Sequence, residues 1–481
     1  MMRPMFREGF EVSKKGVFLR DHKLIMLGVL LLAFVVACSI VIPMRAQNNY
    51  SYFRYWLRYY PMEDRENPKY AYPEIINVVL GPKYAPTTTI RYIGEPSLKS
   101  YHNFLLAYLN ITYNMKYDHP PQDIVIEASL NLTNISGTII VKIIMVRPDG
   151  LKILGFKDKF VGPDTTPAII HIFGSNFIDD LKKELLKHGY SSVALNISDV
   201  NAVRYLFMDP SSMKTLSGKY TISMSILFLG SIKGNVSNVV ENYYVRILGK
   251  AHGLMGTDNL RRDVLVATST ALKGTLLTSV IVAVLSTTLG LFIGMYSAFS
   301  NSIGSKIMRA LIDSFNTLPY VPLIAILLWA TATGRMSTNL SYPAWMMGVI
   351  ISLFMWSRPA KGISGLSRKL LGEPFIEATR CLGAGRAHIM VRHLLPNLLE
   401  YYISQIVLSL PRSVIVVVLI GALGISIGPN LGTYIAQVAG PEMFTVSAWW
   451  VMVPSIFYLG TLGVGIALIS YDIEKRFRRT L

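Results

Sequence analysis

The residues best suited to specific recognition are concentrated in one polar stretch, residues 373–397 (EPFIEATRCLGAGRAHIMVRHLLPN), between two long apolar segments. Helical spacing places a small, mostly apolar face beside a charged edge. The face comprises Phe375, Ala378, Thr379 and Leu382, and the edge comprises Glu373, Glu377 and Arg380. Gly383 and Gly385 are predicted to end this helix, and a second helix is predicted over 387–395 with Pro396 delimiting it. Two short helices at a glycine corner, projecting from a membrane into water, indicate docking to a soluble partner.

Patterns for catalysis and metal binding are absent from the sequence. It holds no G-x-x-x-x-G-K-[ST] phosphate loop, no His-Glu-x-x-His motif and no Cys/His cluster with zinc spacing. Asp313 and Lys273 lie near the ends of apolar segments, so no buried set of ionisable groups suits intramembrane proteolysis or redox chemistry. The chain is therefore predicted to be no enzyme, with no catalytic residue, no metal and no cofactor of its own.

The polar stretch resembles a known loop. Glu377-Ala378-Thr379, then Gly383 after three further residues, then Leu395-Pro396, is similar to the EAA loop of permease subunits of binding-protein-dependent ABC importers. The general pattern has Ala at Thr379 and Ile at His393, and the ending RHLLPN resembles the dipeptide/oligopeptide branch. The resemblance implies that this loop contacts an ATPase. The residues implied are Glu373, Glu377, Ala378, Thr379, Arg380, Gly383, Ala384, Leu395 and Pro396.

A second stretch carries the same resemblance. The segment from His252 (HGLMGTDNLRRDV) is similar to the one that leads into the second span of the same permease branch, with Arg261 in place of a usual glycine. The resemblance covers residues 252–481 and extends to the first span, but it does not cover residues 43–250.

Composition indicates a membrane protein. Of the 481 residues, 51% are hydrophobic, and the mean hydropathy is +0.40, which is too apolar for an ordinary soluble protein. The net charge of +18 could suggest nucleic acid, but many basic residues flank apolar segments on one side of the membrane, so no nucleic-acid partner is expected. Cys38 lies in a predicted span and Cys381 in the polar loop, so they are not expected to pair.

Six transmembrane helices of a type I-like ABC importer are predicted. The first, residues 24–42, follows a basic N-terminus, residues 1–23, and is longer than the ~7–15-residue apolar region of a signal peptide, which is the competing interpretation. The other spans are predicted at residues 264–299, 307–333, 342–356, 398–425 and 447–469. Lys and Arg concentrate near the N-terminus, in the loop 358–397 and in the C-terminal tail. This distribution places both termini in the cytoplasm of a multi-pass plasma-membrane protein.

Residues 43–250 have a different character, rich in Pro, Tyr, Asn, Thr and Ser. Residues 123–133 alternate with period two, residues 138–146 are predicted to be the neighbouring strand, and residues 219–229 form a third candidate. A turn is predicted at 147–150, where Gly150 supplies positive φ, and an amphipathic helix at 178–188. These features predict an inserted β-rich, sandwich-like extracytoplasmic domain between the first span and a five-helix permease core at 251–481.

Arg412 is a charged residue inside a predicted span, the fifth, where it follows Pro411. A charge near the bilayer centre costs at least ~2.5–3.5 kcal/mol, so the side chain should face protein or a water-filled path. Two interpretations stay open: a cationic contact in the translocation path, or a structural pair with a partner-subunit carboxylate or with backbone carbonyls.

Seven Asn-x-Ser/Thr sequons fall in segments predicted to be external, and they are candidate glycosylation sites. They begin at Asn49, Asn110, Asn131, Asn134, Asn196, Asn235 and Asn339. Asn is abundant in these segments in any case, so part of this distribution reflects composition.

By the resemblance, the chain is half of a translocation path for peptides or oligosaccharides, and similar permeases also carry nickel. The partners implied are a second permease subunit in a heterodimer, two ATPase subunits that bind ATP and Mg²⁺, an extracytoplasmic substrate-binding protein and membrane lipid. The alternative function is a polytopic receptor or sensor whose external β domain binds a ligand. An exporter permease is a third, disfavoured by the loop pattern.

Overall fold

The computed structural model describes residues 23–46, 67–101, 104–133, 135–162, 164, 168–198, 202–232, 239–299, 303–333, 344–424 and 428–480. Contacts divide the chain into two units. The helical unit comprises Met1–Trp56, Val266–Pro441 and Met452–Leu481, and the β unit comprises Leu57–Leu265 and Glu442–Val451.

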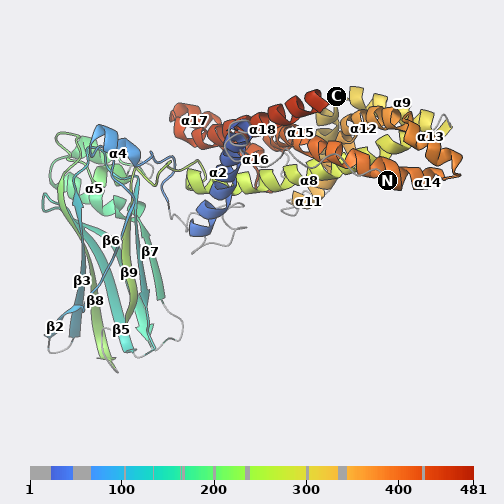
Figure 1. Cartoon of the computed structure of the whole chain (residues 1–481). Coiled ribbons are helices and arrows are strands. Elements are labelled where there is room, and N and C mark those ends of the chain that lie inside the picture. The colour runs from blue at the N-terminus through green and yellow to red at the C-terminus, as the bar shows by residue number, and fades with distance from the viewer. Residues whose placement is uncertain are drawn as a thin grey trace, which may run out of the picture. The chain divides into compact units, whose positions relative to one another are not determined.

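Two antiparallel sheets make up most of the β unit (Figure 1). The first has four strands in the order β1 (Thr88–Arg91), β9 (Val240–Leu248), β4 (Asp123–Leu130) and β7 (Ala168–Phe173). The second has five in the order β2 (Ser97–Tyr101), β3 (Phe104–Met115), β8 (Gly218–Ile232), β5 (Ile135–Val146) and β6 (Lys152–Gly162). One buried cluster draws on both, for example on Ile124 and Ile126 of β4 and on Val141 and Ile143 of β5. The alternating inward side chains of the two sheets therefore build a single core.

The three strands expected from the sequence are present as β4, β5 and β8. The prediction that the second of these neighbours the first is wrong. β4 pairs with β7 and β9, whereas β5 pairs with β6 and β8, because the chain leaves β4 and crosses to the other sheet. The predicted turn is confirmed: Gly150 has φ +86°, and its N–H donates to the Arg147 carbonyl at 3.0 Å.

Helices cover one end of these sheets. They are α4 (Ile75–Leu80), η2 (Gly174–Phe177), α5 (Ile178–Lys187), α6 (Ser191–Leu195) and α7 (Ala202–Leu206). The expected amphipathic helix is confirmed as α5, which buries Ile178, Leu181 and Leu185. Asp179 and Asp180 in its first turn complement the positive end of the helix dipole.

The β unit also includes a segment distant in sequence, Glu442–Val451. This segment contains most of α17 (Pro441–Thr445) and η5 (Trp449–Val451). Trp450 is fully buried, its ring centroid lies 4.6 Å from that of Tyr72, and its Nε1 donates to the Thr257 carbonyl at 3.3 Å. Packing of a large aromatic side chain thus fixes this segment in the unit.

The helical unit contains α2 (Lys23–Ala46), α8 (Val264–Ala298), α9 (Ile303–Thr317), α10 (Tyr320–Thr333), α11 (Ala344–Met355), α12 (Ser357–Leu371), α13 (Pro374–Cys381), α14 (Arg386–Ile389), the π-turn η4 (Met390–Leu394), α15 (Leu395–Ala422), α16 (Leu431–Val438) and α18 (Val453–Thr480). The first two residues of α8 belong to the β unit. Among the described residues, four helices are long and apolar enough to cross a membrane, and a fifth crossing results if α9 and α10 count as one broken span. The chain is a multi-pass membrane protein.

Two predicted spans differ from the structure. The span predicted at 307–333 is broken in the structure, because α9 and α10 meet at an angle of 87°. Pro319 stands at the break, where it lacks an N–H and restricts Leu318. The span predicted at 342–356 is α11 with 12 residues, shorter than the about 20 that cross a bilayer, and residues 334–343 lie outside those described.

Small side chains and hydroxyl groups hold the apolar helices together. A Cβ added to Gly28 of α2 would lie 2.7 Å from the carbonyl oxygen of Gly465 in α18, so the backbones approach closely at this crossing. Ser297 Oγ of α8 donates to Ser364 Oγ of α12 at 2.8 Å. Hydrogen bonds and close backbone contacts replace the hydrophobic driving force that lipid removes.

Candidate functional site

The start of the polar loop is set by a proline. Glu373 is extended (φ −75°, ψ 141°), as expected for a residue before proline, and Pro374 opens α13 at the first helical turn. Glu377 lies in that turn, where the helix dipole favours a negative charge. Thr379 Oγ1 donates to the Phe375 carbonyl at 2.7 Å, so its hydroxyl is satisfied within the helix.

The end of α13 is a Schellman motif. Gly383 has φ +86°, and its N–H donates to the Arg380 carbonyl at 2.9 Å, while the Ala384 N–H donates to the Thr379 carbonyl at 3.3 Å. These two bonds satisfy carbonyls that the helix end would leave unpaired, and they need a residue in the left-handed region. The sequence prediction that Gly383 turns the chain is confirmed.

The prediction that Pro396 delimits the second helix is wrong. A continuous helix runs from Arg386 to Ala422, and Pro396 lies in the first turn of α15. The π-turn η4 immediately precedes it and widens the helix where a proline ring would otherwise meet the preceding turn. The Asn397 side chain also donates to the His393 carbonyl at 2.7 Å, so that this carbonyl has a hydrogen-bond partner.

One buried side chain anchors the corner. Ile376 is fully buried and packs in a cluster with Ile389, Leu394 and Leu398, together with Leu291 and Ile363 of neighbouring helices. Sequence reasoning did not single out Ile376, which is apolar and lies outside the predicted face. Its burial fixes which side of α13 points outward.

The outward side carries exposed apolar and charged groups together. Leu382 is 89% exposed, Val391 66% and Phe375 43%. The basic residues around them are Arg380, Arg386, His388 and Arg392, all exposed, and Glu377 is exposed beside them. Among the residues the structure describes, no ion pair involves Glu377 or Arg380. An apolar patch with a charged rim is the composition of a protein docking surface.

The structure brings the predicted loop residues together and places Arg412 elsewhere. Arg412 lies in the middle of α15, is exposed, and lines a small cavity with Arg358, Asn316, Tyr320 and Ser409. The Asn316 side chain links to Ser357, accepting from its hydroxyl and donating to its carbonyl, both at 3.4 Å. Two guanidinium groups and several polar side chains therefore line one cavity among apolar helices.

Three of the seven sequons lie in the described residues. Asn110 and Asn196 are exposed. Asn131 is partly exposed, and its side-chain amide donates to Glu241 at 3.1 Å. The other four sequons, at Asn49, Asn134, Asn235 and Asn339, lie outside the described residues.

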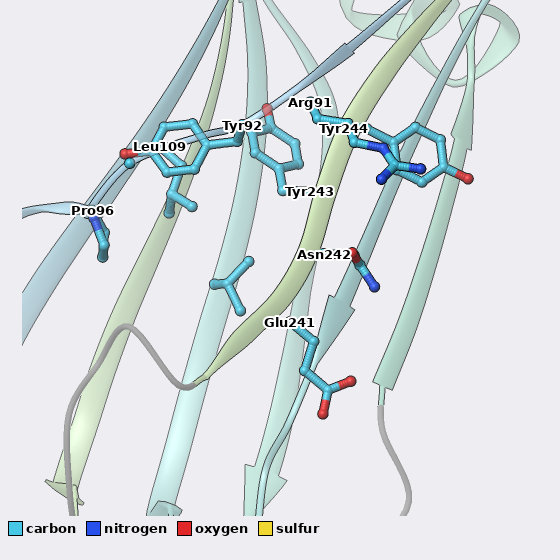
Figure 2. A pocket seen from close by; sticks show the side chains of 10 residues that line it. Arg91, Tyr92, Pro96, Leu109, Glu241, Asn242, Tyr243 and Tyr244 are labelled. Atoms are coloured by element: carbon cyan, nitrogen blue, oxygen red, sulfur yellow. The ribbon is translucent and has the colours of Figure 1, made fainter.

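A groove lies at the start of β9, and Figure 2 shows the side chains that line it. Its lining includes the aromatic side chains Tyr92 and Tyr244, the charged Arg91 and Glu241, and the amide of Asn242. Glu241 accepts hydrogen bonds from Ser129 at 3.2 Å and from Asn131, so its carboxylate is already held in place.

Comparison with known proteins identifies the helical part of the chain. Residues 286–479 match the family described as the binding-protein-dependent transport system inner membrane component. The match covers 194 of the 481 residues. This range includes the polar loop and its Schellman corner, and excludes almost all of the β unit.

Individual relatives are bacterial permeases. A protein of Brucella abortus named a peptide permease is 30% identical over 179 residues, which are 37% of this chain and 56% of that protein. The oligopeptide permease OppC of Mycobacterium bovis is 27% identical over 43% of this chain and 69% of its own length. The di/tripeptide permease DppC of Pseudomonas aeruginosa is 28% identical over 42% and 64%. The chain thus spans little more than half the length of the first of these relatives.

A solved structure of the MetNI methionine ABC transporter in an inward-facing conformation is 20% identical. It covers 43% of this chain and 96% of its own, with a TM-score of 0.32, too low to support an argument.

Proposed function

We propose that this chain is a permease subunit of an ABC importer, which forms half of a translocation path and couples it to separate ATPase subunits. The observation that carries the proposal is the corner at Gly383. It presents Leu382, Phe375 and a charged rim outward from a permease domain while Ile376 anchors it inward. A rigid corner with an exposed apolar tip can be held by an ATPase and moved with it.

The finer architecture is part of the proposal. The chain has six spans, with α9 and α10 as one broken span and α11 as a short one, and both termini are cytoplasmic. The two sheets form a sandwich outside the cell, where the accessible sequons are candidate glycosylation sites. A second permease subunit completes the path, two ATPase subunits hold ATP and Mg²⁺, and a substrate-binding protein delivers substrate. The names of the relatives support peptides as that substrate, with oligosaccharides and metal complexes as alternatives.

Arg412 belongs to the translocation path in this proposal. An arginine in the middle of an apolar helix requires a polar surrounding, and the cavity it shares with Arg358 and Asn316 supplies one. The two guanidinium groups suit the carboxylate of a passing substrate. Arg412→Gln should slow transport, whereas Arg412→Lys, which keeps the charge, should retain more of it.

The β unit is proposed to dock the substrate-binding protein. The groove of Figure 2 favours a second candidate, a receptor function, because aromatic and charged side chains line it. Calorimetry of the full chain in nanodiscs distinguishes the two: micromolar binding of a free peptide or sugar, lost in Tyr244→Ala, supports the receptor and contradicts docking.

The importer function is tested by whether an ATPase copurifies with the chain through this loop. Affinity purification of the full chain from its native membranes should recover ATP hydrolysis activity. Leu382→Asp and Glu377→Lys should reduce that activity at least tenfold, because each alters the exposed tip without changing the anchor Ile376. Lys157→Glu, an exposed charge reversal in the β unit, is the matched control. Undiminished activity in both loop variants would show that this loop is not the coupling element.

A further inference from the structure

Three segments of the β unit are tied together into one base. They are residues 67–80, 250–257 and 442–451. The N–H of His252 donates to the Tyr72 carbonyl, and that of Glu74 to the Gly253 carbonyl, both at 2.9 Å. The Tyr72–Trp450 ring contact described above joins the third segment to the first.

One membrane span begins inside this base, and a second begins shortly after one of its segments. The candidate span that starts with η5 begins at Trp449, inside the base. The span formed by α8 begins at Val264, which also belongs to the β unit and whose N–H donates to the Gly256 carbonyl at 3.0 Å. Leu254 precedes Val264 by ten residues, so it lies within about 35 Å of the start of that span. Chain connectivity therefore holds the base at the membrane boundary.

The base exposes an unusual amount of apolar surface. Helix α4 has the sequence IINVVL and buries none of its side chains. Val78 is 83% exposed, Val79 76%, Leu254 67%, Phe444 72% and Trp449 58%. We call these five residues the apolar foot. Apolar side chains gathered from three segments call for a covering surface.

The neighbouring residue types favour lipid as that surface. The foot contains Trp449. Lys69 lies in the first segment and Lys83 follows it by three residues, and their ammonium groups lie 5.7 and 5.8 Å from the ring centroids of Tyr70 and Tyr84. Trp, Tyr and Lys are the residues enriched where a protein meets the headgroup layer. An apolar surface edged by such residues, on a base that contains the start of one span and is hydrogen-bonded to the start of another, matches an interfacial anchor.

We propose that the apolar foot inserts into the headgroup–acyl boundary of the outer leaflet and holds the β unit against the membrane. The choice of the outer leaflet rests on the proposed external position of the β unit, and the inference goes beyond the proposed transport function. The β unit is then an interfacial domain, with its lipid contact made by α4, Leu254 and the segment before the last span.

The experiment measures lipid contact in the full chain. Cys38 and Cys381 are replaced by serine, and single cysteines are placed at Val79, Leu254 or Phe444 and labelled with bimane in phosphatidylcholine nanodiscs. Ile93→Cys and Leu98→Cys are the matched controls. Ile93 is 93% and Leu98 49% exposed in the same unit. Leu98 lies in β2, at the end of the sheets opposite α4 (Figure 1), and Ile93 lies between β1 and β2.

Spin-labelled lipid with the nitroxide near the headgroup should quench each foot label at least threefold more than either control, with a blue-shifted emission. Quenching equal to that of the controls would overturn the proposal. A blue shift without lipid quenching would also overturn it, because it would mean that a protein surface covers the foot. Neither result depends on ATPase partners, so failure of the transport proposal leaves this test unaffected.

Discussion

The corner at Gly383 permits a test in which backbone strain alone is changed. Gly383 has φ +86°, and a Cβ added there would meet no atom within 4 Å. Gly385, two residues on, is extended (φ −69°, ψ 162°) and is equally free of neighbours. Replacing each with serine therefore adds the same side chain to open space, and only the change at Gly383 meets an unfavourable backbone conformation.

The magnitude follows from these dihedral angles. A residue with a Cβ in the left-handed region costs about 1–2 kcal/mol, so Gly383→Ser should lower the population of the corner relative to open conformations by a factor of about 5–30. Gly385 occupies the N-cap position of α14, where serine is favoured over glycine by a few tenths of a kcal/mol. Gly385→Ser should leave the corner unchanged or slightly stabilised. Gly383→Asn should recover part of the loss, because Asn tolerates this region.

Amide hydrogen exchange of the purified chain measures this directly. The Ala384 N–H is held by the Thr379 carbonyl, so its exchange should be about 5–30 times faster in Gly383→Ser than in the unaltered chain. In a complex with ATPase subunits, the same variant should show weaker substrate-stimulated hydrolysis while remaining in the membrane. Equal exchange rates in the two serine variants would refute the reasoning, because they would mean that the Schellman geometry does not hold the corner.

Three further outcomes are expected. Trp450→Ala should destabilise the β unit by about 3–5 kcal/mol in denaturant unfolding followed by hydrogen exchange, and Trp450→Phe by clearly less, since Trp450 is fully buried. An impermeant maleimide should label Lys157→Cys on intact cells and the exposed native Cys381 only after permeabilisation; the reverse pattern would invert the proposed orientation. Burial, and then the nearby Lys250 ammonium, lower the pKa of His119, so folding favours the neutral imidazole. The β unit should therefore lose stability as the pH falls below about 6.5, and an unchanged pH dependence in His119→Gln would contradict this assignment.

Local pattern was sufficient to predict most individual elements. Period-two alternation marks β4, the amphipathic spacing marks α5, and the glycine corner marks the end of α13. Each of these depends on contacts close in sequence or on a single buried face. The pairing partners of β4 and of β5 could not be predicted in this way, because adjacency in sequence does not decide which sheet a strand joins.

The effect of proline on the helices was predicted wrongly at one position and was not predicted at another. Pro396 was expected to end a helix, yet the π-turn η4 accommodates it within a continuous one. The break between α9 and α10 was not predicted, although Pro319 stands at that position. A proline reports a missing N–H and a restricted neighbour, and whether the helix bends or continues depends on the packing around it.

The residues from His252 to Asp263 make contacts that their sequence pattern does not predict. A Cβ at Gly256, where φ is +68°, would lie 2.2 Å from the Ala71 carbonyl oxygen. The Thr257 hydroxyl accepts from the Ala71 N–H at 2.8 Å and donates to the Pro68 carbonyl at 2.7 Å. These contacts join residues far apart in sequence, so no local periodicity could have predicted them.

The same segment also departs from the permeases that it resembles. Arg261 stands where they have glycine, and it adopts φ +59°, a conformation that favours glycine. Its guanidinium donates to the Asn67 carbonyl at 2.9 Å, and the Asn67 side chain donates back to the Arg261 carbonyl at 3.2 Å. These two hydrogen bonds offset a strain of about 1–2 kcal/mol. Because Asn67 lies in the part of the chain that the permease resemblance does not cover, the added β unit itself supplies the partner that lets arginine replace glycine here.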